Sequence, residues 1–312
     1  MKRAFVFPGQ GSQSVGMGRE LAAAMPEARH LFQEVNDALN QNLSHLMFEG
    51  PEDELTLTEN AQPALMALSM AVVRTLENGG MDLAASAAFV AGHSLGEYSA
   101  LAAAKAMSLV DTARILKTRG QAMQQAVPVG VGAMAALLGV DAEQAADIAA
   151  AAANDGICAV ANDNGGGQVV LSGDAAAVEA AIEIAKERGV KRAIPLPVSA
   201  PFHSPLMAPA AEVMAEALAE IPLARPVVPL VANVAAEPVS EPDAIRDLLV
   251  EQVTSMVRWR ETVLFLRGQE VELLAELGAG KVLSGLTRRI DRELQSVSVQ
   301  TPDDIEAFYA TL

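Results

Sequence analysis

Cysteine and histidine are scarce in this chain of 312 residues, which holds one cysteine, Cys158, and four widely spaced histidines. A single cysteine cannot form an internal disulfide, and scattered histidines offer no ligand cluster for zinc. A lone cysteine fits a reducing compartment. We therefore expect a cytoplasmic protein without a zinc site.

Aromatic residues and long apolar runs are also rare. Aromatics make up 4% of the chain while hydrophobic residues reach 51%, which excludes a disordered protein and predicts a core of aliphatic side chains and methionine. The best apolar run, residues 64–73, includes Ser69 and stops at Arg74. It is shorter than the roughly 18 residues of a membrane span. The apolar start ends at Pro8, too early for a signal peptide, so we expect a soluble, untargeted protein.

Basic residues are heavily outnumbered by acidic ones. The chain has 22 Lys and Arg against 39 Asp and Glu, a formal net charge of −17. Such a field repels phosphate backbones and anionic lipid head groups. We expect neither a nucleic acid nor a membrane surface as a general partner.

The order of apolar segments and glycine loops predicts an α/β fold. A short strand leads through a glycine loop into a helix, and this alternation continues. The first part of the chain is predicted to contain a strand at 3–7, a helix at 17–40, a helix from Pro63 to Leu76, a strand at 87–91 and a helix at 97–106.

The middle of the chain has a different pattern, in the order βαββαβ of a ferredoxin-like unit. Its predicted strands lie at 133–140, 157–161, 168–172 and 190–196, and its helices at 142–153 and 175–188. The chain then returns to a helix at 208–219, a strand at 228–233, a helix from Asp243, and a strand and helix within 273–289. We predict a hydrolase-like, parallel-sheet large domain (residues 1–126 and 199–312) with an inserted ferredoxin-like subdomain (residues 127–198).

The most informative motif is Gly92-His93-Ser94-Leu95-Gly96, a G-x-S-x-G sequence between a predicted strand and a predicted helix. A serine on such a sharp turn exposes its hydroxyl at the carboxyl end of the sheet. The N–H of Leu95, at the helix start, then faces any oxygen on the carbon that Ser94 attacks. The motif predicts a nucleophilic serine.

A serine nucleophile needs a base, and the chain offers four histidines for it. His30 and His45 lie among polar residues of the first helical region, and the side chain of His93 is expected to point away from the face of Ser94. His203 remains, on a proline-bounded loop after a predicted strand and before a helix. A rigid loop at the carboxyl edge of the sheet suits a catalytic base.

A glycine loop at residues 9–14 follows the first strand but is not a dinucleotide fingerprint, because Ser14 stands where a third glycine is required. We expect the loop to turn the N–H of Gln10 into the cleft as a second oxyanion donor. Residues 278–281 likewise lack the earlier glycine of a phosphate loop, since that position is Ala275.

Four ordered motifs resemble the malonyl-CoA:acyl carrier protein transacylases of type II fatty acid synthesis, and the resemblance covers nearly the whole chain. The motifs are Phe5-Val6-Phe7-Pro8-Gly9-Gln10-Gly11-Ser12-Gln13, Glu59-Asn60-Ala61-Gln62-Pro63-Ala64, Gly92-His93-Ser94-Leu95-Gly96-Glu97-Tyr98 and Pro201-Phe202-His203-Ser204.

The resemblance implies Ser94 as nucleophile, His203 as general base, and the N–H groups of Gln10 and Leu95 as the oxyanion hole. It implies Arg119 as the partner of the malonyl carboxylate, a planar guanidinium that can hold a carboxylate through two hydrogen bonds.

The resemblance also assigns a neutral carbonyl to orient the histidine, with Gln252 at the matching position, and it places Gln62 and Asn162 near the substrate. Turn and helix-cap roles for Gln62 and Asn162 remain open.

The implied reaction is a ping-pong transfer of malonyl from malonyl-CoA to the phosphopantetheine thiol of acyl carrier protein, which needs no metal and no bound cofactor. We expect a monomeric enzyme. Since that carrier is acidic, a local basic patch must bind it. The candidates are Lys281 with Arg288 and Arg289, or a group on the subdomain that comprises Lys186, Arg188, Lys191 and Arg192. The alternatives are a serine thioesterase of the hydrolase class, a transferase for another acyl-CoA such as methylmalonyl-CoA, and a non-catalytic binding module.

Overall fold

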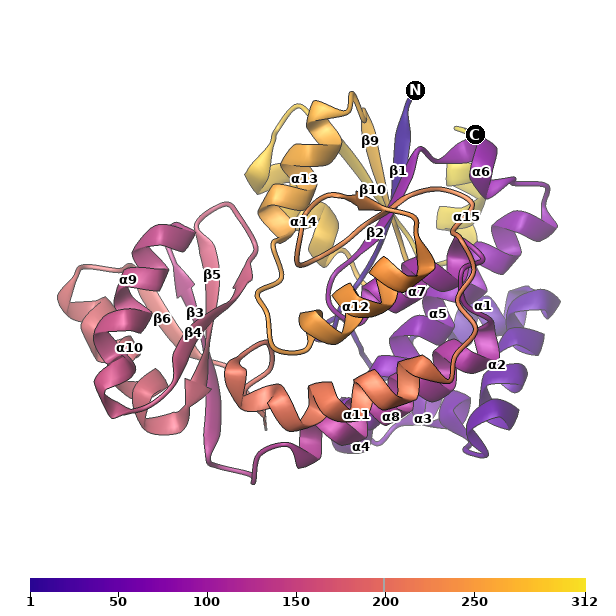
Figure 1. Ribbon diagram of the computed structural model, residues 1–312. Coiled ribbons are helices and arrows are strands. Elements are labelled where there is room, and N and C mark those ends of the chain that lie inside the picture. Colours follow the sequence, from indigo (N-terminus) through magenta and orange to yellow (C-terminus); the bar gives the residue numbers. More distant parts are fainter. Residues whose placement is uncertain (199) are drawn as a thin grey trace.

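A six-stranded sheet forms the centre of the larger part of the molecule (Figure 1). The computed structural model describes residues 1–198 and 200–312. The strand order is β10-β9-β1-β2-β7-β8, parallel except for the last pair. The strands are β1 (Arg3–Phe7), β2 (Phe89–Gly92), β7 (Leu230–Val231), β8 (Pro238–Val239), β9 (Leu273–Leu277) and β10 (Gln295–Val299).

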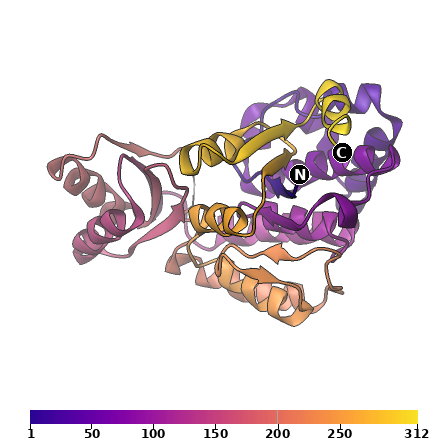
Figure 2. The same ribbon diagram turned by 90° about the horizontal axis from the view of Figure 1, so that it is seen from above.

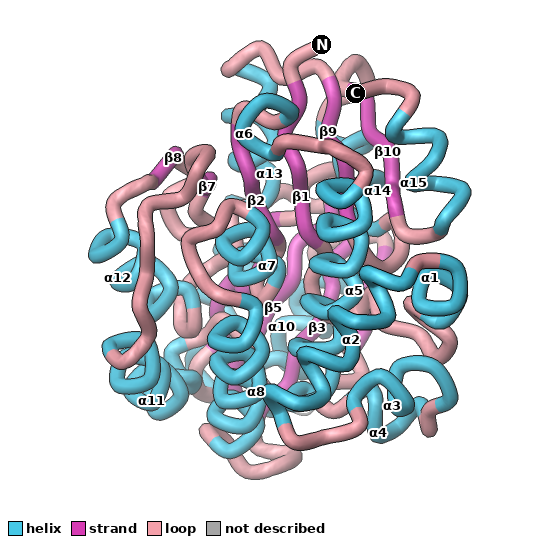
Figure 3. The backbone as a smooth tube through the Cα atoms, turned by 90° about the vertical axis from the view of Figure 1, so that its right-hand side faces the viewer, coloured by secondary structure: helices cyan, strands magenta, loops and turns pink. Residues whose placement is uncertain are grey.

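Helices cover both faces of this sheet. Successive side chains of a strand point to opposite faces, so Phe5 and Phe7 enter one core cluster while Ala4 and Val6 enter another. On the first face, α5 (Thr58–Asn78) and α7 (Gly96–Ala103) lie against the strands. The same core continues into α2 (Pro26–Leu39), α8 (Leu109–Gln125) and α11 (Ala208–Ala219), which pack on other helices, and α2, α5, α7 and α8 are visible in Figure 3. The second face packs against α13 (Trp259–Gly268) and α14 (Val282–Ile290).

Further helices complete this part of the chain. They are α1 (Arg19–Ala24), α3 (Leu43–Glu49), α4 (Glu52–Thr56), α6 (Leu83–Ser86), α12 (Pro242–Gln252), α15 (Pro302–Tyr309) and the 3₁₀ turn η2 (Pro205–Met207). None of the helices in the described residues is long and apolar enough to cross a membrane.

A second, four-stranded sheet stands apart from the first and forms the lobe at the left of Figure 2. Its order is β4-β5-β3-β6 and its pairs are antiparallel. The elements are β3 (Gly132–Leu138), α9 (Ala142–Ala152), η1 (Ala153–Asp155), β4 (Cys158–Asp163), β5 (Gln168–Asp174), α10 (Ala175–Glu187) and β6 (Arg192–Pro195). This is the predicted βαββαβ unit, so the expected fold class is confirmed.

Two predicted helices have other bounds in the structure, and both differences lie near a proline. The single helix expected over 17–40 is broken at Met25, whose extended backbone separates α1 from α2, with Pro26 as the first residue of the new helix. The helix expected to begin at Pro63 starts instead at Thr58, and Pro63 lies inside it. Proline is tolerated there, one turn from the start, because α5 is buried along most of its length and tertiary packing outweighs the lost hydrogen bond.

Four further elements departed from expectation. Strand β7 covers only Leu230–Val231 of the predicted 228–233. Helix α8 was not predicted, although it carries Arg119, and neither were β10 and α15 at the end of the chain. The polar alternation of β10 suits an edge strand with one face against α14 and weakens the apolar signal on which the prediction relied.

Candidate active site

Ser94 stands on a sharp turn between β2 and α7, as the motif predicted. Its backbone is left-handed, with φ of 54°. A side chain on Gly92 would collide with the main chain of Gly96, and one on Gly96 would collide with the main-chain oxygen of Phe7. Glycine is therefore required at both positions of the elbow, for packing of the turn on itself and on β1.

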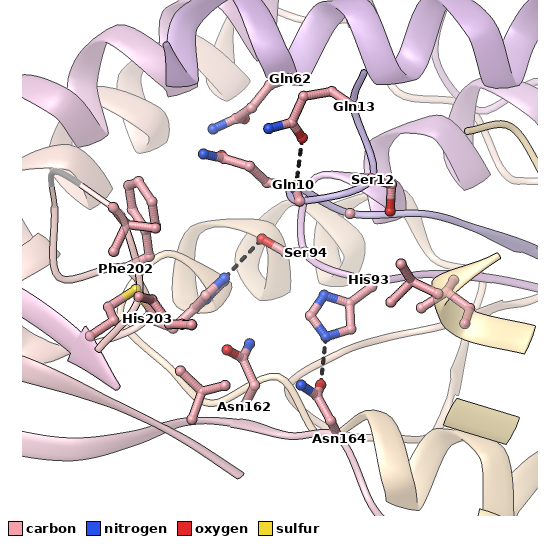
Figure 4. Close-up of a pocket in the computed structure, with 18 of the residues that line it drawn as sticks. Gln10, Ser12, Gln13, Gln62, His93, Ser94, Asn162, Asn164, Phe202 and His203 are labelled. Carbon is pink, nitrogen blue, oxygen red and sulfur yellow. Dashed lines mark hydrogen bonds between the residues drawn. The ribbon is translucent and has the colours of Figure 1, made fainter. Parts of the chain in front are cut away.

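His203 lies beside this serine (Figure 4). Its Nε2 is 2.8 Å from the Oγ of Ser94, and its Nδ1 is 2.8 Å from the main-chain oxygen of Gln252. Since a carbonyl oxygen only accepts, Nδ1 carries the proton and Nε2 accepts from the serine hydroxyl. The loop is held by Ser204, whose hydroxyl donates to the oxygen of Pro201 at 2.7 Å.

The orienting carbonyl belongs to the main chain of Gln252, while its side chain has other partners. The side-chain oxygen of Gln252 accepts from Arg119 at 2.9 Å, and its Nε2 donates to the carboxylate of Glu97 at 2.7 Å. A substitution at 252 therefore leaves the carbonyl that faces His203 in place and acts on Arg119 and Glu97.

Burial, followed by the nearby charge of Arg119, lowers the pKa of His203 to about 3. The imidazole is therefore neutral over the physiological range and free to accept a proton. Burial also lowers the pKa of His93, whose Nε2 is 2.9 Å from the side-chain oxygen of Asn164. Figure 4 shows this ring directed to Asn164 and not to Ser94.

Arg119 reaches the same serine from α8 and is only 1% exposed. Its guanidinium donates to the side-chain oxygen of Gln62 at 2.9 Å, to that of Gln252 at 2.9 Å and to the Oγ of Ser94 at 3.2 Å. The guanidinium carbon also lies 5.6 Å from the centre of the Tyr98 ring. All of these hydrogen-bond acceptors are neutral, an unusual setting for a buried positive charge.

Two residues of the site were missed from the sequence. The side chain of Asn233 accepts from the N–H of Ser94 at 2.7 Å and donates to the oxygen of Gly92 at 2.6 Å. Glu97, 1% exposed, accepts from the N–H of Asn233 at 3.2 Å, and burial raises its pKa to about 7. Asn233 ends a predicted strand at the carboxyl edge of the sheet, a position that could have identified it.

The two expected oxyanion donors lie on adjoining segments. Gly9 lacks a side chain where one would meet the main-chain oxygen of His93, so the loop after β1 rests on the elbow. Within the described residues, the main-chain N–H groups of Gln10 and Leu95 make no hydrogen bond. Free N–H groups beside a nucleophile can stabilise an oxyanion.

A cavity of about 400 Å³ joins these groups. Ser94, His203, Arg119 and Gln62 line its polar part, and the remaining wall is largely apolar, with contributions from Met123, Met134, Val170, Leu196, Val198 and Phe202. Asn162, on β4, lines the cavity close to His203 in Figure 4. Among the described residues, no group of histidine, cysteine and carboxylate side chains is arranged to hold a metal.

The two candidate basic groups are placed differently. Lys281, Arg288 and Arg289 are exposed on or beside α14, which also contributes Val282, Leu283 and Leu286 to the cavity. Arg289 donates to the side chain of Gln168, another cavity residue, at 3.1 Å. The second group contributes nothing to the lining of this cavity and is exposed on α10, on β6 and between them: Lys186, Arg188, Lys191 and Arg192.

An α/β fold with a hydrogen-bonded serine and histidine in one cavity defines a class of enzymes that act on acyl groups. The acyl transferase domain family matches residues 4–299. The malonyl CoA-acyl carrier protein transacylase of Bacillus subtilis is 47% identical over 312 residues, covering 100% of this chain and 97% of that protein. The chain belongs to the acyl transferase family and, within it, to the malonyl CoA-acyl carrier protein transacylases.

Solved structures agree with this placement. The acyl-carrier-protein-S-malonyltransferase of Bartonella henselae has a TM-score of 0.98 and 55% identity, covering 100% of this chain and 99% of that one. A malonyl-transacylase solved in complex with a type II polyketide acyl-carrier protein has a TM-score of 0.97 and 41% identity, with both chains covered at 100%. The predicted family and enzyme class are confirmed.

Proposed function

We propose that this protein transfers a malonyl group from malonyl-CoA to the phosphopantetheine thiol of acyl carrier protein, through malonyl-Ser94, for fatty acid biosynthesis. The observation that carries the proposal is Arg119, a buried guanidinium with neutral acceptors that lies 3.2 Å from the Oγ of Ser94. Its site fits an acyl group that ends in a carboxylate, and a neutral acyl chain would leave the buried charge unpaired.

In the first half-reaction, Ser94 attacks the thioester carbonyl while His203 takes the hydroxyl proton. The N–H groups of Gln10 and Leu95 stabilise the resulting oxyanion. The C–S bond then breaks, and the CoA sulfur leaves with the proton from His203. Arg119, held by the side chain of Gln62, keeps the malonyl carboxylate in place.

In the second half-reaction, the thiol of the carrier protein attacks malonyl-Ser94 and gives its proton to His203, which returns it to the serine oxygen. A main-chain carbonyl on Nδ1 makes His203 a weaker base than a carboxylate would. A weak base activates water poorly but suffices for a thiol, so the acyl-serine persists until the carrier binds.

The test is the intact mass of the protein after mixing with malonyl-CoA alone. A malonyl adduct that persists without an acceptor and transfers when holo carrier protein is added supports the proposal. Steady hydrolysis of malonyl-CoA would identify a thioesterase instead, and no adduct at all would identify a binding module.

The low pKa of His203 leads to a prediction for the pH dependence of acyl-serine formation. A pKa of about 3 leaves the imidazole neutral well below the usual range, so we expect the rate to stay within about twofold between pH 8 and pH 5.5. An unperturbed histidine would lose about tenfold over this interval. The rate is measured by stopped-flow detection of CoA release. A rate that falls with an apparent pKa near 6.5 would contradict the prediction.

For the carrier protein, we propose that the α14 basic patch, defined as Lys281, Arg288 and Arg289, is the docking site. The position of the patch supports this proposal, because α14 carries both the patch and part of the cavity wall. An acidic partner is repelled by the net charge of −17 and is attracted where cations gather. The phosphopantetheine arm could then enter the adjoining cavity.

Charge reversal of this patch should separate the two half-reactions. With Arg288→Glu and Arg289→Glu together, we expect acyl-serine formation from malonyl-CoA to stay within about twofold while transfer to the carrier slows by about tenfold or more. The slowing should shrink as salt approaches about 1 M, where the Debye length is about 3 Å.

The matched control is Arg188→Glu with Lys191→Glu, the same charge change between α10 and β6 of the second basic group. A loss confined to this control pair would move the docking site to the subdomain. Equal losses in both half-reactions of the α14 variant would mean that the pair supports the fold or the CoA phosphates.

We further propose that residues 127–198 form an inserted subdomain in a monomeric, cytoplasmic protein. The chain enters and leaves the second sheet at one place, because a side chain on Gly132 would collide with Pro201. The predicted boundary at Ser199 lies outside the described residues. Main-chain hydrogen bonds between Ala161, Asp163 and Val257 join β4 to the larger part.

A further inference from the structure

Glu97 is a buried carboxylate that the transfer mechanism does not use. It lies on α7, three residues after Ser94, and is 1% exposed. Its Oε2 accepts from the side-chain Nε2 of Gln252 at 2.7 Å and from the N–H of Asn233 at 3.2 Å. No cation is hydrogen-bonded to Glu97 within the described residues. Glu97 therefore acts on the site only through Gln252 and Asn233.

The amide of Gln252 can take only one orientation beside Glu97. Its Nε2 faces three acceptors: the Glu97 carboxylate, the main-chain oxygen of Ser94 at 3.0 Å and the side-chain oxygen of Asn233 at 3.3 Å. The oxygen of Asn233 is itself fixed by the N–H of Ser94. Rotation of the Gln252 amide would turn its oxygen toward the main-chain oxygen of Ser94 and the side-chain oxygen of Asn233, neither of which can donate a hydrogen bond.

This orientation decides which atom of the Gln252 amide faces Arg119. With Nε2 directed to Glu97, the other end of the amide is the Oε1 that accepts from Arg119 at 2.9 Å. The reversed amide would present two N–H groups to a guanidinium that has only donors. Arg119 would then lose one of the two neutral oxygens that hold it beside Ser94.

We propose that Glu97 is a positioning residue that orients the Gln252 amide, and so fixes Arg119 where it receives the carboxylate of the acyl group. The proposal rests on the carboxylate-binding role of Arg119 given above. A carboxylate in direct contact with Arg119 would compete with the substrate for its donors. Separated from it by one amide, Glu97 holds the arginine in place and leaves those donors available.

Two conservative variants of Glu97 separate the effect of side-chain length from the effect of the negative charge. Glu97→Gln keeps the length of the side chain, and one carbonyl oxygen can accept both hydrogen bonds that Oε2 accepts now. Glu97→Asp keeps the carboxylate but is one methylene too short for the 2.7 Å contact with Gln252. The readout is the ratio of kcat/KM for malonyl-CoA to that for acetyl-CoA, measured as acyl-serine formation.

We expect Glu97→Asp to lower this ratio by about tenfold while acetyl transfer changes by less than about threefold, and Glu97→Gln to keep most of the ratio. In a double-mutant cycle, Glu97→Asp should have no further effect on the ratio when Gln252→Ala is already present. Equal losses for both acyl donors would show a merely structural role and overturn the proposal, as would a Gln variant worse than the Asp variant.

Arg119→Ala distinguishes this inference from the proposed function. An unchanged ratio in Arg119→Ala would reject carboxylate binding by Arg119 itself. A collapsed ratio in Arg119→Ala with parent ratios in both Glu97 variants would reject the role of Glu97 alone. If thermal unfolding shows that Glu97→Asp is not folded, Glu97→Ala replaces it as the variant that cannot reach Gln252. A lowered ratio in Glu97→Ala with the ratio kept in Glu97→Gln supports the proposal, and a parent ratio in Glu97→Ala overturns it.

Discussion

Ser94→Ala is expected to abolish the malonyl adduct and to lower transfer to the carrier protein by at least about 10³-fold. The hydroxyl is the group that becomes acylated, and alanine offers no atom for the covalent intermediate. The elbow itself should survive, because its glycines and the hydrogen bond from the N–H of Ser94 to Asn233 do not involve the hydroxyl. Intact-mass spectrometry after incubation with malonyl-CoA, with thermal unfolding to verify the fold, measures the outcome.

Ser14→Ala is the matched control, an exposed serine on the glycine loop near the same cavity. Ser14→Ala should form the malonyl adduct to the same extent as the parent protein. Adduct formation by Ser94→Ala within tenfold of the parent would falsify the assignment of the nucleophile.

Arg119→Ala is expected to lower the ratio of kcat/KM for malonyl-CoA to that for acetyl-CoA by about 10²-fold or more. The variant loses the guanidinium that would pair with the malonyl carboxylate. It also loses the buried charge that a neutral acetyl group would leave unpaired. The two changes act in opposite directions on the two donors, so the ratio reports both.

Two comparisons make this result specific. Arg114→Ala removes an exposed arginine from the same helix, α8, and should leave the ratio unchanged. Arg119→Lys keeps a positive charge but not the planar fork, so it should restore the ratio only in part. An unchanged ratio in Arg119→Ala would mean that the acyl carboxylate binds elsewhere.

Local sequence was sufficient to predict the elements whose signals are local. The elbow follows from Gly92 and Gly96, which are the residues that the turn requires, and the alternation of strands and helices predicted both sheets. The start of α5 was misjudged because burial along that helix outweighs the preference of Pro63. The break at Met25 was missed although Pro26 follows it as the first residue of α2. Helix α8 was not recognised, although Arg119 lies on it.

The sequence by itself determined the fold class, the nucleophile candidate and the one histidine able to serve it. Only the tertiary structure decided how the rest of the site is connected. It shows that the main chain of Gln252 meets His203 while its side chain joins Arg119 to Glu97. Residues 97, 119 and 252 lie on three helices, and their approach is set by the packing of those helices beside the sheet. Motif spacing along the chain carries no information about which donor meets which acceptor across such a distance in sequence.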